Sequence, residues 1–341
     1  MVGPEGSAGL APSESGNRGG IRRRLAGSYP TGGFRPIMAP DTVPDPFEDG
    51  MADTTQDLGG KTVLVTGATA GIGEVTAVEL ARRGASVIVV GRSPQKLDAT
   101  VAKIREETGK DAADALLADL TSQSQVRRLA EQVRARHPRL DVLLNNAGAI
   151  FEKRSETVDG IERTFALNHL AYFLLTNLLL DNLKAAGAAR VVNVSSEAHK
   201  IAARGINFDD IEGKKKYGPW VAYGQSKLAN ILFSNELARR LEGTGATSNA
   251  LHPGIVSSSF SEGNGTLGWI LRRMYAVVGI SSGTGAKTSI HLAASPDVEG
   301  VAGGYFAKSK PAKTSGPARD AAAARRLWQV SEAMTGVPAT A

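Results

Sequence analysis

The sequence predicts an α/β protein whose parallel sheet is doubly wound, with helices on both faces. From Lys61 onward, short apolar runs alternate with stretches of helical periodicity. The apolar runs do not alternate with polar residues, which is typical of strands buried on both faces. The first run also leads directly into a glycine-rich turn that opens a helix, an arrangement typical of nucleotide-binding sheets.

The predicted elements follow one another from residue 61 to about residue 194. The strands are "KTVLVT", "SVIVV", "ALLA", "LDVLLNN" and "ARVVNVS". Four helices lie between them. The first begins at Ile72, the second runs from near Pro94 to Glu107, the third begins at Ser122, and the fourth ends near Lys184. No sequence repeat and no Pro/Gly linker follows residue 60, so residues 58–341 are expected to form one Rossmann-type domain.

Residues 1–57 are expected to be a disordered extension. Seven of the fifteen prolines precede residue 47, among Gly- and Ser-rich runs without apolar periodicity. Arg22–Arg24 are not followed by an apolar block, which argues against a secretory signal and leaves a transit peptide unsupported. Met51 begins a stretch that resembles a natural start, so residues 1–50 are interpreted as an over-long start-site assignment.

A chain that starts at Met51 is therefore expected to fold and turn over substrate like the full chain, because a disordered segment contributes no core. Solubility and specific activity of the two chains are the measurement. A loss of either on truncation would mean that residues 1–50 dock on the domain.

Composition excludes several classes of site. The chain has 341 residues, 42% hydrophobic and 22% charged, and no cysteine, so disulfides, thiolate catalysis and iron–sulfur clusters are excluded. Its five histidines occur singly, without metal-ligand spacing, and no metal site is expected. The net charge of +6 comes from scattered Lys and Arg, so a small phosphate-bearing ligand is expected rather than a nucleic acid.

The most apolar long window, residues 165–183, is not expected to span a membrane, since it contains Asn168, His169, Asn177, Asp181 and Asn182. It is interpreted as a helix buried in the core or in a subunit contact. The chain is accordingly expected to be a cytoplasmic homodimer or homotetramer, with the apolar excess of this helix buried against a second subunit.

The turn after the first strand, "TGATAGIG", is the candidate phosphate site. Gly67, Gly71 and Gly73 permit positive φ angles and let backbone N–H groups approach a pyrophosphate. Their G-x-x-x-G-x-G spacing differs from the commonest dinucleotide fingerprint, G-x-G-x-x-G.

The second strand predicts which dinucleotide is bound. An acidic residue at its end would bind the ribose hydroxyls of NAD, but this strand reads "VIVVGRS" and places Arg92 there. Because a guanidinium can hold a 2′-phosphate in charge-assisted bonds, NADP(H) is expected to be preferred over NAD(H). Ala70, inside the turn, offers no second basic contact.

In "VAYGQSKLAN", Tyr223 and Lys227 are four residues apart at the start of a helix and therefore share one face. A phenol has a pKa of about 10 and needs about 4 kcal/mol of differential stabilisation to act as a base near pH 7. A cation about 4 Å away supplies about 4 kcal/mol at an effective dielectric constant of about 20. The pair is therefore a candidate for general acid–base catalysis.

Six motifs in order resemble the short-chain dehydrogenases/reductases, over roughly residues 58–335. They are "TGATAGIG", "ADL", "NNAG", "NVSS", "YGQSK" and "HPG". The stretches "VVNVSSEAHK", "YGQSKLANILFSNELARRL" and "ARRLWQVSE" are similar to the retinol dehydrogenase-like branch. The resemblance implies an NAD(P)-dependent oxidoreductase that acts on CH–OH groups.

The resemblance also implies the roles of single residues. It makes Asn168, Ser196, Tyr223 and Lys227 the catalytic set. The implied cofactor-binding residues, besides Tyr223 and Lys227, are Gly67, Thr69, Gly71, Ile72, Gly73, Arg92, Asp119, Leu120, Asn145, Ala147, Gly148, Pro253 and Gly254. Asp119 would face the adenine, and Asn168 would hold a water that links the site to solvent. Ser195 and Tyr217 are competitors for the serine and tyrosine roles, but Tyr217 is followed four residues later by Val221 rather than by a lysine.

The expected function is hydride transfer between nicotinamide and a lipophilic alcohol or carbonyl. The lipophilic preference rests on the apolar side chains of residues 260–275, which read either as a substrate lid or as a helix packed on the core. The alternative is a regulator that binds the dinucleotide without turnover, but a sensor has no need of the Tyr223 base.

Overall fold

The computed structural model describes residues 57–254 and 281–337, all within one compact unit, residues 45–341. The expected disordered extension and the apolar segment with Phe260 and Trp269 lie outside the described residues.

The described residues form one eight-stranded sheet, which confirms the predicted doubly wound architecture. The strands are β1 (Thr62–Thr66), β2 (Ser86–Gly91), β3 (Ala113–Leu117), β4 (Val142–Asn145), β5 (Arg190–Val194), β6 (Thr247–His252), β7 (Tyr305–Ala307) and β8 (Lys310–Pro311). Their order in the sheet is β3-β2-β1-β4-β5-β6-β7-β8, and every neighbouring pair is parallel except β7 and β8. The chain order reverses between β1 and β4, and a ligand crevice forms at the carboxyl ends of such strands.

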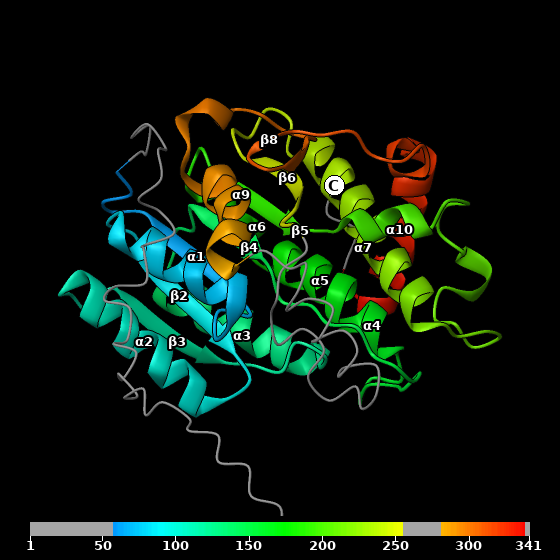
Figure 1. The fold of residues 1–341 in the computed structure, drawn as a ribbon, viewed down its shortest axis with the longest axis horizontal. Coiled ribbons are helices and arrows are strands. Elements are labelled where there is room, and N and C mark those ends of the chain that lie inside the picture. Colours follow the sequence, from blue (N-terminus) through cyan, green and yellow to red (C-terminus); the bar gives the residue numbers. More distant parts are fainter. Residues whose placement is uncertain (1–56, 255–280, 338–341) are drawn as a thin grey trace, which may run out of the picture. The chain divides into compact units, whose positions relative to one another are not determined.

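Helices cover both faces of the sheet (Figure 1). One face carries α1 (Gly71–Arg82), α2 (Pro94–Thr108) and α9 (Ser282–Ala294), and the other carries α3 (Gln123–Arg136), α5 (Ala171–Leu178) and α7 (Pro219–Arg240). Successive residues of β1 alternate between the two cores: Val63 and Val65 pack with α1, and Leu64 packs with α3 and α5. This is why the strands read as continuous apolar runs.

The apolar window 165–183 is helical except at Leu179. The helix runs without a break from α4 (Arg163–Phe165) through a π-helical turn (Ala166–Leu170) into α5, and α6 (Leu180–Ala185) begins after Leu179, which has φ −107°. Of the helices that the structure describes, none is long and apolar enough to cross a bilayer.

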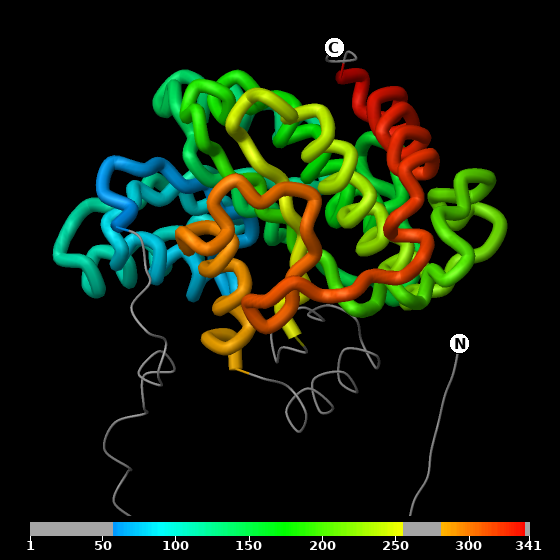
Figure 2. Tube along the Cα trace, turned by 90° about the horizontal axis from the view of Figure 1, so that it is seen from above, coloured from blue at the N-terminus to red at the C-terminus, as the bar shows by residue number. Residues whose placement is uncertain are grey.

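The apolar side chains of this window are buried within the chain itself, which corrects the expected burial against a second subunit. The C-terminal helix α10 (Ala321–Thr335) packs along α7 (Figure 2). Its Trp328 stacks on Phe233 at 5.8 Å between ring centroids and meets Phe173 edge-on at 4.9 Å. The sequence pattern showed the apolar excess of the window but not that α10 would cover it.

Candidate active site

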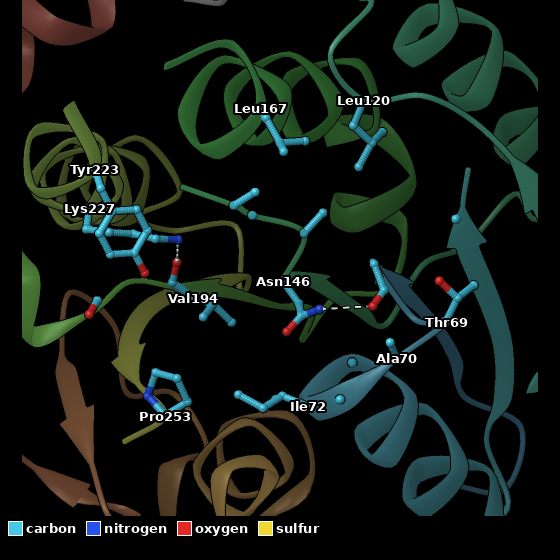
Figure 3. A pocket seen from close by; sticks show the side chains of 18 of the residues that line it. Thr69, Ala70, Ile72, Leu120, Asn146, Leu167, Val194, Tyr223, Lys227 and Pro253 are labelled. Carbon is cyan, nitrogen blue, oxygen red and sulfur yellow. Dashed lines mark hydrogen bonds between the residues drawn. The ribbon is translucent and has the colours of Figure 1, made fainter. Parts of the chain in front are cut away.

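A pocket of 760 Å³ lies at the carboxyl ends of the parallel strands, where the sheet topology places a ligand crevice. Figure 3 shows Tyr223 and Lys227 at one end of it and Thr69 and Ala70 at the other. The structure brings most of the predicted site residues to its wall: Gly67, Thr69, Gly71, Ile72, Gly73, Arg92, Asp119, Leu120, Ala147, Gly148, Ser196, Tyr223, Lys227, Pro253 and Gly254.

The glycine turn after β1 is a tight cradle. Gly67 has φ +65°, which disfavours any residue with a side chain. A Cβ on Gly73 would stand 2.3 Å from the Gly67 carbonyl oxygen and 2.5 Å from Asn146 Nδ2, so no larger residue fits. Asn146 fixes the turn by donating from Nδ2 to the Thr66 carbonyl at 2.8 Å. This open backbone, at the N-terminus of α1, fits the pyrophosphate of a dinucleotide.

Asn145 does not border the pocket, which corrects the prediction that it lines the cofactor. Its side chain is completely buried, and Nδ2 donates to Thr176 Oγ1 and to Asn193 Oδ1, both at 3.0 Å. The next residue, Asn146, borders the pocket instead. Consecutive residues at a strand end point to opposite faces, and the motif "NNAG" does not say which asparagine faces the cofactor.

Basic side chains border the pocket beside the end of β2. Arg92 follows β2, and Ser93 caps α2 by accepting a hydrogen bond from the Lys96 backbone N–H. Lys96 borders the pocket together with Arg92 and Ser93. It is a second basic side chain on this part of the wall, and its position one turn into α2 was the available sequence signal. Asp119, which also borders the pocket, accepts from both the N–H and the hydroxyl of Thr121.

Tyr223 and Lys227 project from the first turns of α7, as their spacing predicts. Lys227 Nζ lies over the Tyr223 ring, 5.5 Å from its centroid, and donates to the Val194 carbonyl at 3.1 Å. Asn230 Nδ2 donates to the same carbonyl at 3.1 Å. Burial lowers the pKa of Lys227 from 10.5 to about 7, close to neutral pH. The spacing alone does not reveal this effect, because it depends on what surrounds α7.

The two serines after β5 have different surroundings. Ser195 is buried, and its hydroxyl donates to the Lys227 backbone carbonyl at 2.7 Å. Ser196 Oγ accepts from the Ala198 N–H at 3.2 Å, which leaves its hydroxyl proton available to a ligand in the pocket. The geometry therefore favours Ser196 as the donor to a reacting oxygen.

Asn168 lies in the π-helical turn, behind the pocket wall. Its Oδ1 accepts from the Ala149 N–H at 2.9 Å, and its Nδ2 donates to the Ala149 carbonyl and to Ser226 Oγ. A Cβ on Gly148 would stand 3.2 Å from Asn168 Oδ1 and 3.3 Å from Lys227 Nζ, so both side chains lie against the same backbone. Both ends of the Asn168 side-chain amide are therefore hydrogen-bonded to the protein. The expected contact with a water would have to come from the backbone of Asn168 instead.

The wall beside Tyr223 is mostly apolar. Phe151, Leu167, Ala198 and Trp220 border the pocket, and the Trp220 ring meets the Tyr223 ring edge-on at 6.4 Å. The competing Tyr217 lies behind this wall, where its hydroxyl donates to the Phe151 carbonyl at 2.9 Å.

Two polar side chains, Glu197 and His252, interrupt the apolar wall. His252 Nδ1 accepts from the Glu197 backbone N–H at 3.4 Å. Among residues 57–254 and 281–337, no group of three His, Asp or Glu side chains is placed to hold a metal ion.

Comparison with known proteins assigns the chain to a family. A family model described as short chain dehydrogenase matches residues 61–266, more than half of the chain. The chain is a short-chain dehydrogenase. Members of this family bind NAD(P), and the chain is accordingly an oxidoreductase that acts on alcohols.

Two relatives of this short-chain dehydrogenase are named as retinol dehydrogenases. Retinol dehydrogenase 12 of Mus musculus is 43% identical over 291 residues, which cover 85% of this chain and 91% of that protein. Retinol dehydrogenase 14 of Mus musculus is 43% identical over 292 residues, which cover 82% and 86%. The predicted resemblance to the retinol dehydrogenase-like branch is confirmed.

Solved structures agree with this assignment. A crystal structure of an uncharacterised protein from Mycobacterium paratuberculosis is 37% identical, with a TM-score of 0.66, and covers 83% of this chain and 96% of that one. A short chain dehydrogenase from Shigella flexneri, solved as a complex with NADP, is 26% identical, with a TM-score of 0.58, and covers 75% and 100%.

Proposed function

We propose that this short-chain dehydrogenase interconverts a lipophilic alcohol and its carbonyl compound with NADP(H). The observation that carries the proposal is that Ser196, Tyr223 and Lys227 border the same pocket as the glycine turn. Tyr223 and Lys227 lie at the opposite end from Thr69 and Ala70 of that turn (Figure 3). A ligand that lies along the pocket would therefore present its nicotinamide to the three side chains.

The residues divide the proton chemistry among them. Tyr223 takes the hydroxyl proton of an alcohol or returns it to a carbonyl oxygen, and the charge of Lys227 stabilises the phenolate. The Ser196 hydroxyl donates to the reacting oxygen as charge develops on it. Asn168 holds Gly148 and Ala149 in place beside Lys227. The nicotinamide, when bound, accepts or supplies the hydride.

The preference for NADP(H) is supported by the basic group after β2. No carboxylate follows β2 in the sequence "VIVVGRS", whereas Arg92, Ser93 and Lys96 border the pocket there. A charge-assisted bond of about 1.5 to 3 kcal/mol corresponds to a preference of about 10- to 100-fold.

Arg92→Asp is expected to invert this preference, because it removes the attraction and places a like charge beside the 2′-phosphate. The measurement is kcat/KM for NADPH and for NADH, at fixed ionic strength because Arg92 is exposed. Lys96→Ala is the matched control, expected to weaken NADPH use without favouring NADH. If the wild-type enzyme prefers NADH, or if the ratio does not change in the variant, Arg92 does not read the 2′-phosphate.

The lipophilic substrate is supported by the wall of Phe151, Leu167, Ala198 and Trp220 beside Tyr223. The relatives named as retinol dehydrogenases point to the same chemical class. A panel of retinal, decanal, acetaldehyde and cyclohexanone with NADPH and NADH, followed by absorbance at 340 nm, tests the proposal. Higher kcat/KM for retinal and decanal than for acetaldehyde is the expected result, and the reverse order would contradict the substrate class.

The alternative is a silent regulator of the same fold. It predicts tight binding of NADPH by titration together with no turnover of any panel member. The pocket-facing Tyr223 and Ser196 favour the enzyme, because binding alone does not use them.

A further inference from the structure

The ammonium of Lys227, on whose charge the proposed catalysis depends, is buried among few hydrogen-bond acceptors. It is fully buried, and Nζ donates to the Val194 carbonyl. An ammonium has three donors, so the carbonyl satisfies only part of its capacity. In the described part of the chain, two aromatic rings have centroids within 6 Å of Nζ: that of Tyr223 at 5.5 Å and that of Tyr172 at 5.9 Å.

Tyr172 has no role among the predicted catalytic residues. It lies on α5, is 1% exposed, and its hydroxyl is buried without a hydrogen-bond partner among residues 57–254 and 281–337. Burial, followed by the negative charge of an ionised Tyr223, raises the pKa of Tyr172 well above that of a free phenol. Tyr172 therefore remains a neutral ring beside the cation and does not compete with Tyr223 as a base.

We propose that Tyr172 is a positioning residue for Lys227, whose ring face holds the ammonium beside Tyr223 and favours its charged form. The inference rests on the proposed function, in which that charge stabilises the Tyr223 phenolate. A cation that is desolvated over an aromatic face is attracted by the ring quadrupole, and the attraction is larger in a buried site than at a surface.

The other described groups around Lys227 Nζ carry no charge that could stabilise the ammonium, so the ring of Tyr172 matters for its charged form. Within residues 57–254 and 281–337, the titratable side chains that face Nζ are Tyr223 on its own helix and Tyr172 on α5. From β5 and from the loop after β4 it meets uncharged groups, the Val194 carbonyl and the backbone of Gly148. Desolvation lowers the pKa of Lys227, and the rings act in the opposite direction by favouring the cation.

Two substitutions separate the ring from the hydroxyl. Tyr172→Phe keeps the ring and removes only the unpartnered oxygen, so the Lys227 titration and kcat should remain unchanged. Tyr172→Leu removes the ring, and the Lys227 midpoint should fall by about 0.4 to 1.5 pH units. Because the midpoint starts at about 7, the charged fraction at pH 7 and therefore kcat should fall about 2- to 16-fold, while the KM for the carbonyl substrate stays constant.

The decisive measurement is the titration of Lys227 by NMR in protein labelled with ¹³Cε-lysine, without cofactor. The signal of Lys227 is assigned by its loss in Lys227→Met. Thermal unfolding checks that each Tyr172 variant is folded, and Tyr172→Met, which also lacks a ring, replaces the leucine variant if that one does not fold.

A lower midpoint in the ring-less variant and an unchanged midpoint in Tyr172→Phe would support the inference. An unchanged midpoint in the ring-less variant, or an equal fall in Tyr172→Phe, would overturn it. The titration needs no turnover, so an inactive wild-type protein would refute the proposed function while the role of the ring would still be decided.

Discussion

Tyr223→Phe is expected to lower kcat by at least about 100-fold, because it deletes the oxygen that transfers the proton. The affinity for NADPH should change little, since the phenylalanine ring keeps the packing of Tyr223 against Ile150 and Trp220. Steady-state kinetics at 340 nm and a fluorescence titration with NADPH measure the two quantities separately.

Tyr217→Phe is the matched control for the loss of a hydroxyl near the pocket. Tyr217 donates to the Phe151 carbonyl, so this variant should lose some stability but keep kcat within a few-fold of wild type. If Tyr223→Phe retains more than about a tenth of the wild-type kcat, or if Tyr217→Phe is equally inactive, Tyr223 is not the catalytic acid–base group.

Lys227→Met is expected to inactivate the enzyme and, at the same time, to stabilise the cofactor-free protein. Burial lowers the pKa of Lys227 from 10.5 to about 7, which at 1.36 kcal/mol per unit costs about 4 kcal/mol of folding free energy at pH 7. Methionine fills similar space without a charge, and Asn230 still donates to the Val194 carbonyl. The rate and the affinity for NADPH should both fall, since the cation is lost.

The sign of the pH dependence provides a second test of Lys227. Between pH 7 and pH 10.5 the unfolded chain binds more protons at this site than the folded chain, so wild-type stability should rise with pH across this window. The advantage of Lys227→Met should therefore shrink from pH 7 to pH 10, as measured by urea unfolding. The exposed Lys184→Met is the control, expected to change stability by less than about 0.5 kcal/mol. If Lys227→Met has a lower free energy of unfolding than the wild type at pH 7, burial of the ammonium does not cost stability.

The central sheet could be predicted because its strands are buried on both faces and carry a local signal. Val63, Leu64 and Val65 read as one apolar run since both cores need them. The π-helical turn within the helix and the covering of α5 by Trp328 could not be predicted. The first depends on backbone hydrogen bonding within the turn, and the second depends on a contact between residues about 155 positions apart.

The site was predictable to the extent that local spacing determines it. The helical spacing of Tyr223 and Lys227 and the glycine turn both follow from neighbours in sequence. The burial of Lys227, the approach of Tyr172 from another helix, and the choice of Asn146 over Asn145 depend on packing between elements. The roles of the predicted residues stay predictions until variants are measured.

The expected homo-oligomer was inferred from the apolar excess of residues 165–183, and the structure no longer supports that inference. The apolar side chains of residues 165–183 pack against α3, α7 and α10 of the same chain. Light scattering of the purified protein would show whether another surface mediates association.

Hydride transfer at this site is tested most directly with NADPH deuterated at both C4 positions of the nicotinamide. Incubation with retinal or decanal, followed by mass spectrometry of the alcohol, should show one deuterium on the carbon that carries the hydroxyl. The product of wild-type enzyme should be labelled, and Tyr223→Phe should form almost none. An alcohol that forms without deuterium, or the absence of any alcohol from a wild-type protein that binds NADPH, would contradict the account.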